Sequence, residues 1–494
     1  MKPASCDGFP WHRSTGLVLV LCLLPAALLM VEQLLEAVKG EPRWWIEGLT
    51  NNNLTFNSML LHLLRGRFDI DPTIIGNEGL VREGVTYAYF GIAPALFRLP
   101  FLPLRNFAAI DFTPLECAFA VSLMTLFKIL SVRTVWRASD QRGPVLLLIL
   151  FIASIIAGGA QVQFLRPSVY QEVCLWAGVC AAAFVYWTLR GYYSERGFTP
   201  GLLLALATAS GLCLLTRVST ALGLYIAFGL IWLQPAWHAL RSAGPSRLGR
   251  GWRIASLLPS ALMLVAFVVA AALINYKRWG NPLLFSDYDR YLWAIRLEPK
   301  WLDRVHQYGE FNFIRMGYGL MYYMFPAFVL RGSDGNLLWS QFRDRTINAA
   351  ELPPSSFLFS DPLLVGLAGY ALVRLVFYRD IPRSAIVIAA LTGLLVPAVL
   401  MLMAVYMAFR YRMEFYPCLE FCALIGFSHI LTAPSRWAKT FFAVAVPWGT
   451  VASVLLLLLY SVSPGGSADR AMNGASIVSY YVLRTPLLHR LLSR

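Results

Sequence analysis

The stretch "ASLLPSALMLVAFVVAAALI", Ala255 to Ile274, contains no charged residue over a length that suffices for a helix to cross a lipid bilayer. A second uncharged run extends from Ala385 to Ala408. The whole chain of 494 residues is 58% hydrophobic and only 14% charged, whereas soluble domains carry about 25% charged residues. The sequence therefore predicts an all-α, polytopic membrane protein.

Apolar runs of spanning length recur along the chain. They predict about eleven transmembrane helices, near residues 16–35, 112–131, 144–160, 168–190, 200–215, 217–234, 254–275, 362–378, 385–408, 415–431 and 440–460. The first run lacks a small-residue cleavage pattern, so we expect an uncleaved helix with its N-terminus in the cytoplasm. We expect residues 1–460 to form one transmembrane domain and residues 461–494 to form a C-terminal tail.

The net charge of +15 comes from basic residues scattered between the apolar runs, which favours contact with anionic lipid headgroups over binding of nucleic acid. With eleven spans, the arginine-rich short loops all fall on one side, which the positive-inside rule assigns to the cytoplasm. Two long segments, 36–111 and 276–361, then lie outside the cytoplasm. Both are too long for simple connections, so we expect them to fold against the outer face of the membrane.

Four arginines break the charge rule, because they fall on predicted outer turns: Arg166, Arg217, Arg410 and Arg412. Ionisable groups at membrane depth usually face the interior of a bundle or a wet cavity. Guanidinium groups match phosphate oxygens, so we expect these arginines to converge on one site for a lipid-borne phosphate. The alternative is that each arginine pairs locally or reaches the headgroups.

Aromatic and acidic residues accompany these arginines. The motif "RPSVYQE" places Tyr170 and Glu172 close to Arg166, and the motif "FRYRMEFYP" places Tyr411 and Glu414 beside Arg410 and Arg412. We expect these four neighbours to support substrate binding, with Glu414 orienting Arg410 or Arg412.

Asp69 and Asp71 are the candidate catalytic carboxylates of the first outer segment. They alternate in "RGRFDIDP", so in an extended strand both would face the same way. Either can serve as a general base, or as a ligand for a divalent cation such as Mg²⁺ or Mn²⁺. A solvated turn before Pro72 is the alternative, and the sequence contains no other pattern that identifies a metal.

Several motifs resemble those of the GT-C-type integral-membrane glycosyltransferases, in an uncharacterised bacterial branch of that class. These motifs are "LLRGRFDID…GVTYAYFGIAPALFRLP", "RPSVYQE", "NYKRWGNPLLF" and "FRYRMEFYP", and they extend over most of residues 45–420. The resemblance implies a polyprenyl-phosphate sugar as donor and an envelope glycan or lipid as acceptor. It also implies an active site on the periplasmic or outer face of the bacterial inner membrane.

By the same resemblance, Asp69 or Asp71 is the base that activates the acceptor hydroxyl. The arginines that hold the leaving lipid phosphate are Arg166, Arg217, Arg278, Arg410 and Arg412. Members of the class commonly carry the key carboxylate soon after the first helix, where this chain reads "LTNNNLTF". Either the acid has shifted to Asp69 or Asp71, or the chain has lost transferase activity.

Two other functions fit a membrane protein with outer arginines. A flippase or transporter for lipid-linked sugars should carry charged residues in the middle of its helices. Lys128 falls near the end of its predicted span, which favours the enzyme. A glycan polymerase or ligase is not separated from the transferase by the sequence.

Overall fold

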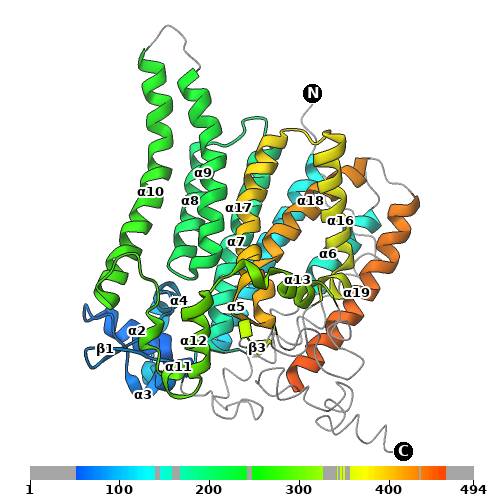
Figure 1. Cartoon of the computed structure of the whole chain (residues 1–494). Helices are drawn as coiled ribbons and strands as arrows, with labels where there is room; N and C mark the ends of the chain where they lie inside the picture. Colours follow the sequence, from blue (N-terminus) through cyan, green and yellow to red (C-terminus); the bar gives the residue numbers. More distant parts are fainter. Residues whose placement is uncertain are drawn as a thin grey trace, which may run out of the picture.

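The computed structural model describes residues 52–139, 145–157, 167–241, 247–325, 342, 345–347, 349–350, 356–432 and 436–462. Within these residues the chain is a bundle of long and shorter apolar helices with a set of short elements at one end (Figure 1). The predicted first span, 16–35, and the tail from residue 463 onward lie outside the described residues.

Every other predicted span coincides with an apolar helix. Within the described residues, six helices are long and apolar enough to cross a membrane, and shorter apolar helices stand at the remaining predicted spans. The bundle consists of α5 (Thr113–Ala138), α6 (Val145–Ala157), α7 (Val169–Tyr193), α8 (Pro200–Leu214), α9 (Val218–Arg241), α10 (Arg247–Trp279), α16 (Pro362–Val373) with the π-helical turn η9 (Arg374–Tyr378), α17 (Ser384–Met403), α18 (Tyr416–Thr432) and α19 (Arg436–Val462). The expected polytopic helical architecture is confirmed.

Burial distinguishes central from peripheral helices. In the most apolar 18-residue stretch of α7, 89% of the residues are buried inside the protein, whereas in the corresponding stretch of α10 only 22% are buried. The helix α10 therefore stands at the edge of the bundle, as Figure 1 shows, and its exposed leucines and valines suit contact with lipid. The helix α7 forms the centre, and its first turn reaches the end where the short elements gather.

The short elements come from both of the long segments predicted between spans. The first segment contributes η1 (Asn52–Leu54), α2 (Thr55–Leu63), α3 (Pro72–Ile75), η2 (Gly76–Glu78), β1 (Leu80–Arg82), β2 (Val85–Tyr87), α4 (Ala93–Phe97), η3 (Leu99–Phe101) and η4 (Phe107–Ala109). The second contributes η6 (Tyr288–Arg290), α11 (Leu292–Arg296), α12 (Pro299–Tyr308), η7 (Phe313–Arg315), α13 (Met316–Met324), β3 (Ala349–Ala350) and α15 (Phe357–Ser360). The stretch between α17 and α18 adds β4 (Tyr406–Met407) and η10 (Phe409–Glu414). We call this end of the bundle the loop end.

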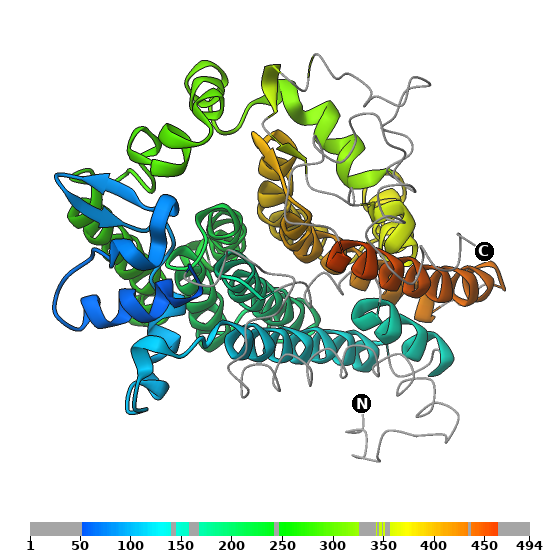
Figure 2. The same ribbon diagram turned by 90° about the horizontal axis from the view of Figure 1, so that it is seen from below.

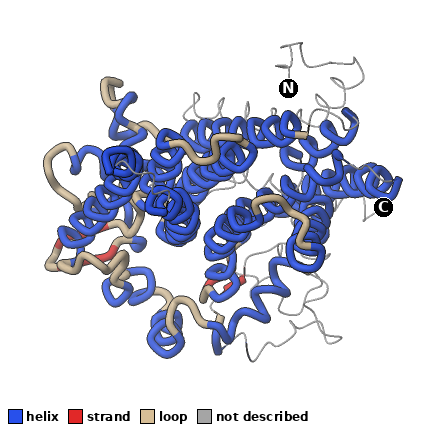
Figure 3. The backbone as a smooth tube through the Cα atoms, turned by 90° about the horizontal axis from the view of Figure 1, so that it is seen from above, coloured by secondary structure: helices blue, strands red, loops and turns tan. Residues whose placement is uncertain are grey.

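The two long segments are joined to each other. In the first, β1 and β2 form an antiparallel hairpin whose turn residues Glu83 and Gly84 both have positive φ, as two-residue hairpin turns require. Leu80 of this hairpin then pairs with Tyr291 of the second segment. Figure 2 shows the two segments side by side at the loop end, and Figure 3 shows how few strands they contain. The segments form one structure over the bundle.

A close seam joins α9 to α17. A Cβ atom added at Gly393 of α17 would lie 2.3 Å from the carbonyl oxygen of Gly223 and 2.3 Å from the backbone nitrogen of Ala227. The two backbones therefore touch, which is the usual way in which small residues allow helices to pack inside a membrane.

The variant Gly393→Ala should lose about 1–3 kcal/mol of stability, because its methyl group would collide with the backbone of α9. The matched variant is Gly229→Ala, whose added Cβ atom meets nothing within 4 Å, and it should be at least as stable as the wild type. Thermal unfolding in detergent measures both. Equal melting temperatures for the two variants would contradict the close seam.

Candidate functional site

Two of the predicted phosphate-binding arginines meet at one tyrosine ring at the loop end. Arg217 stands between α8 and α9, whereas Arg410 and Tyr411 belong to η10. The guanidinium carbons of Arg217 and Arg410 lie 5.0 Å and 5.1 Å from the centre of the Tyr411 ring. Contacts of this kind hold guanidinium groups by cation–π attraction. We refer to Arg217 and Arg410 as the arginine pair.

Glu414 fixes one member of this pair. Its carboxylate accepts a hydrogen bond from Nε of Arg217, and it also accepts bonds from the hydroxyls of Ser219 at 3.0 Å and Thr220 at 2.6 Å. The expected role of orienting Arg410 or Arg412 is therefore replaced by a pairing with Arg217, which the sequence places 197 residues away. Glu414 is buried, while the side chain of Arg217 remains 19% exposed. The guanidinium is held in place with part of its surface accessible.

Arg410 lies over aromatic rings, and one of these rings, that of Tyr170, interacts with a carboxylate of the first segment. Its guanidinium carbon lies 5.1 Å from the ring centre of Tyr170, at the start of α7. Tyr170 also interacts with Glu78, whose carboxylate accepts a 2.5 Å hydrogen bond from the hydroxyl of Tyr291. The structure thus brings Tyr170 and Tyr411, two of the predicted supporting residues, together with Arg410.

Glu310 is a second carboxylate in this region, and it lies between α12 and η7. Its carboxylate accepts a 3.0 Å hydrogen bond from the hydroxyl of Tyr288. Burial raises the pKa of Glu310 above its usual value, against the opposing effects of that hydrogen bond and of the positive charges on Arg217 and Arg315. A carboxylate of raised pKa close to a guanidinium is suited to accept a proton beside a bound anion.

Arg315 fixes the backbone that carries Glu310. Its guanidinium is fully buried and donates to the carbonyl oxygens of Gly309 (3.0 Å), Glu310 (2.9 Å), Thr346 (2.7 Å) and Met403 (3.2 Å). Burial lowers the pKa of Arg315 to about 10, so the group stays charged at neutral pH. It therefore joins the second segment to the end of α17, just before η10.

Arg278 and Arg412 do not join the arginine pair. Arg278 is 3% exposed and donates a 2.8 Å hydrogen bond to the carbonyl oxygen of Phe90. Arg412 is fully buried and forms a 2.5 Å ion pair with Asp361. Both were expected to hold a lipid phosphate, but the structure directs both guanidinium groups into the protein and does not bring them together with Arg217 and Arg410. Arg166 lies outside the described residues.

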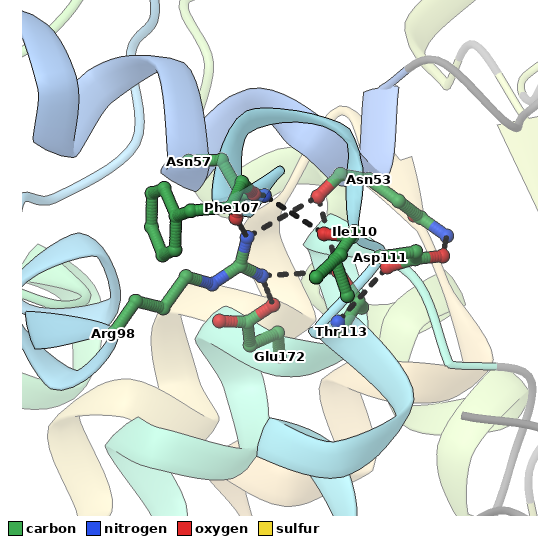
Figure 4. A network of polar contacts seen from close by, with 8 residues as sticks. All are labelled: Asn53, Asn57, Arg98, Phe107, Ile110, Asp111, Thr113 and Glu172. Carbon is green, nitrogen blue, oxygen red and sulfur yellow. Dashed lines mark hydrogen bonds and ion pairs between the residues drawn. The ribbon is translucent and has the colours of Figure 1, made fainter. Parts of the chain in front are cut away.

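Glu172, expected beside the substrate, is also directed into the protein. Figure 4 shows its carboxylate in a fully buried 2.7 Å ion pair with Arg98. Arg98 also bonds to the hydroxyl of Thr113 at 3.1 Å and to the side chain of Asn57. Asn57 in turn donates to backbone carbonyls of the loop before α5. This network attaches the first segment to α5 and α7.

Asp69 and Asp71 each have local partners. The carboxylate of Asp69 accepts a 3.0 Å bond from Arg67 and lies 3.3 Å from His62. Burial alone would raise the pKa of Asp69, but the hydrogen bond from Arg67 and the nearby charges lower it overall. Asp71 is the N-cap of α3, and hydrogen bonds from Thr73 lower its pKa. The solvated turn before Pro72 describes Asp71 better than a strand does.

The surroundings of Asp69 and Asp71 also show whether the described residues form a site for the expected divalent cation. Within the described residues, no group of three or more His, Cys, Asp or Glu side chains is arranged to hold a metal ion. Asp71 does line a cavity of about 130 Å³ with Ser58, His62 and Arg65, but that set offers one carboxylate together with two basic side chains. The described residues therefore do not by themselves identify a site for Mg²⁺ or Mn²⁺; in proteins Mg²⁺ is commonly held by one or two carboxylates together with water and substrate phosphates.

No sequence pattern singles out five further residues of this region: Glu78, Glu310, Arg315, Tyr288 and Tyr291. Each lies in a long segment in which no apolar periodicity draws attention to single residues. The available signal was a lone acidic residue within an aromatic stretch, as in "QYGEFNF" for Glu310.

Comparison with known proteins finds similarity in three-dimensional structure only. No protein-family model matches the chain, and no curated protein matches it either. Among solved structures it is similar to the oligosaccharyltransferase of Archaeoglobus fulgidus in the apo form, with 13% identity and a TM-score of 0.47 over 98% of this chain and 59% of that chain. Structures of the same enzyme tethered to an acceptor peptide, and in complex with Zn and sulfate, match with TM-scores of 0.43 and 0.42, 13% identity, and 98% and 96% of this chain.

This chain spans less than two thirds of the length of those structures, covering 59%, 59% and 56% of them.

Proposed function

We propose that this protein is a membrane glycosyltransferase that moves a sugar from a polyprenyl-phosphate donor to an envelope glycan or lipid acceptor. We place the reaction at the loop end, facing the periplasm or exterior of a bacterial inner membrane. The observation that carries the proposal is the meeting of Arg217 and Arg410 at Tyr411, with Glu310 within the electrostatic reach of Arg217. Two fixed guanidinium groups beside a carboxylate can bind a lipid phosphate and activate a hydroxyl.

In this reaction the acceptor oxygen attacks the anomeric carbon of the sugar, and the bond from that carbon to the phosphate oxygen breaks. The proton of the acceptor hydroxyl passes to the carboxylate of Glu310. The electron pair of the broken bond remains on the phosphate, whose growing charge the arginine pair stabilises. Glu78 and the tyrosines bonded to it offer hydrogen-bonding groups for the sugar hydroxyls.

Glu310 is our preferred base because burial raises its pKa, whereas the pKa values of Asp69 and Asp71 are lowered by their own partners. A carboxylate with a higher pKa accepts a proton more readily, provided that it is ionised at the working pH. Asp69 and Asp71 remain the alternative base.

One observation favours a transporter as the second candidate. The helix α5 extends to Ala138, so Lys128 lies in its interior and not near its end, which corrects the expectation from the sequence. Lys128 pairs with Glu420 of α18 at 2.6 Å, and both are buried. Charges inside a bundle are typical of transport pathways. Here the two charges are opposite in sign and pair with each other, which favours a role in holding α5 and α18 together over a transport pathway.

Release of polyprenyl phosphate tests the proposal without knowledge of the sugar. The full chain, purified into nanodiscs, would be given a panel of polyprenyl-phosphate hexoses and pentoses with a membrane glycolipid extract as acceptor. We expect one donor to be consumed, with free polyprenyl phosphate appearing only when acceptor is present. A polymerase would instead give a ladder of products. In sealed vesicles, a flippase would move the donor across the bilayer without consuming it, and that result would overturn the transferase.

A further inference from the structure

A chain of buried polar side chains extends through the bundle beneath the loop end. Arg412 pairs with Asp361 at 2.5 Å, and the hydroxyl of Tyr416 donates to the same carboxylate at 3.3 Å. On the other side of Tyr416, the ammonium of Lys128 lies 5.3 Å from the centre of its ring and pairs with Glu420 at 2.6 Å. We call these five residues the buried chain.

The buried chain joins elements that are far apart in the sequence. Arg412 belongs to η10, Asp361 lies at the junction of α15 and α16, Tyr416 and Glu420 lie in α18, and Lys128 lies in α5. All five side chains are at most 5% exposed, and two positive charges face two negative ones. These five side chains are therefore shielded from solvent, and their charges cancel.

Arg412 is adjacent in sequence to the groups proposed to bind the donor. η10 contains only six residues, and Arg410, Tyr411 and Glu414 belong to it together with Arg412. Arg410 and Tyr411 are directed toward Tyr170 and Arg217, whereas Arg412 is directed into the bundle, with its guanidinium carbon 4.3 Å from the ring centre of Phe357. A short 3₁₀ helix has little stability of its own, so the buried contact of Arg412 fixes its orientation.

A contribution to folding stability alone does not account for the buried chain. Replacing a buried ion pair by well-packed apolar side chains is often neutral or stabilising, so these pairs are better explained by the single arrangement that they specify.

We propose that the buried chain positions η10. Asp361 and the Lys128–Glu420 pair hold this short helix so that Arg410 and Tyr411 stay beside Arg217, and the arginine pair faces the donor phosphate. This inference rests on the proposed function. It assigns Arg412 the role of an anchor in place of a phosphate ligand.

The first test uses Asp361→Asn, which removes the charge and keeps the shape. We expect kcat/KM for release of polyprenyl phosphate to fall at least tenfold, mainly through a higher KM for the donor. The matched control is Asp380→Asn, which breaks the partly exposed pair of Asp380 with Arg374 outside η10 and should change kcat/KM by less than about twofold. A lower melting temperature with unchanged kcat/KM in Asp361→Asn would show a merely structural role and overturn the proposal.

A second set of variants separates folding from positioning. Glu420→Gln should reduce kcat/KM, and the exchanged pair Lys128→Glu with Glu420→Lys should restore part of it. If Asp361→Asn fails to fold, the paired apolar variant Arg412→Met with Asp361→Leu provides the comparison. That variant should fold but lose at least tenfold in kcat/KM. Full activity in it would overturn the proposal.

A spectroscopic measurement distinguishes this inference from the proposed function. With 3-fluorotyrosine at position 411, the ¹⁹F resonance should be a single narrow line in the otherwise unaltered protein, and broad or multiple lines in Asp361→Asn. This result would support the anchoring of η10 even if no donor were transferred. Identical spectra would overturn the anchoring whatever the fate of the transferase assay.

Discussion

Replacement of Arg410 by glutamine is expected to lower kcat/KM for donor consumption by about 100- to 1,000-fold, the usual effect of removing one group that stabilises a developing anion. Arg410 is held over the rings of Tyr170 and Tyr411, so its charge is presented at a fixed place. Glutamine keeps a polar side chain but provides no charge for the leaving phosphate. Arg410→Lys should recover only part of the activity, because an ammonium lacks the planar fork of donors that matches phosphate oxygens.

Release of polyprenyl phosphate and equilibrium binding of polyprenyl phosphate itself measure the effect. The control is Arg105→Gln, an exposed arginine of the first segment, which should remain within about twofold of the wild type. If Arg410→Gln binds polyprenyl phosphate and consumes donor as the wild type does, Arg410 has no part in the donor site.

Replacement of Glu310 by glutamine is expected to lower kcat by about 100- to 10,000-fold, which is the usual contribution of a positioned base. Glutamine preserves the shape and can still receive a hydrogen bond from Tyr288, so loss of activity would report loss of the proton acceptor. The matched change is Asp303→Asn, on an exposed position of α12, which should leave kcat unchanged.

The role of Glu310 as a base also predicts the direction in which the rate changes with pH. Burial raises the pKa of Glu310, and a base acts only when ionised, so the rate should rise as pH increases through that raised pKa and then level off. In Glu310→Gln this acidic limb should disappear. Should Glu310→Gln keep both the rate and the limb, while Asp69→Asn with Asp71→Asn abolishes transfer, the base belongs to the aspartates.

Much of the bundle could be predicted because the length and polarity of an apolar run are local properties. The 20 residues from Ala255 to Ile274 require a membrane helix whatever their neighbours are. Likewise, the prolines of "APALFRLPFLP" prevent a continuous helix, and the structure has only the five-residue α4 with the turn η3 there.

The site could be predicted only in part, because contacts across the fold decide it. Arg410 and Arg412 look alike in the sequence, but in a 3₁₀ helix of three residues per turn, positions two apart point in different directions. One therefore faces Tyr170 and the other is buried against Asp361. The pairing of Glu414 with Arg217 has no local signature, since an acid one helical turn from an arginine suggests a nearby partner instead.

The contact between Gly223 and Gly393 has a consequence for ligand discrimination. Arg217 immediately precedes α9, and the stretch leading to Arg410 follows α17, so the two cationic groups extend from helices whose main chains already touch. Such helices cannot spread apart to admit a bulkier anion without losing that contact. In the proposed transferase, selection among phosphates would therefore depend on a site of fixed size, whereas adaptation to different sugars or acceptors would depend on the segments that cover the bundle.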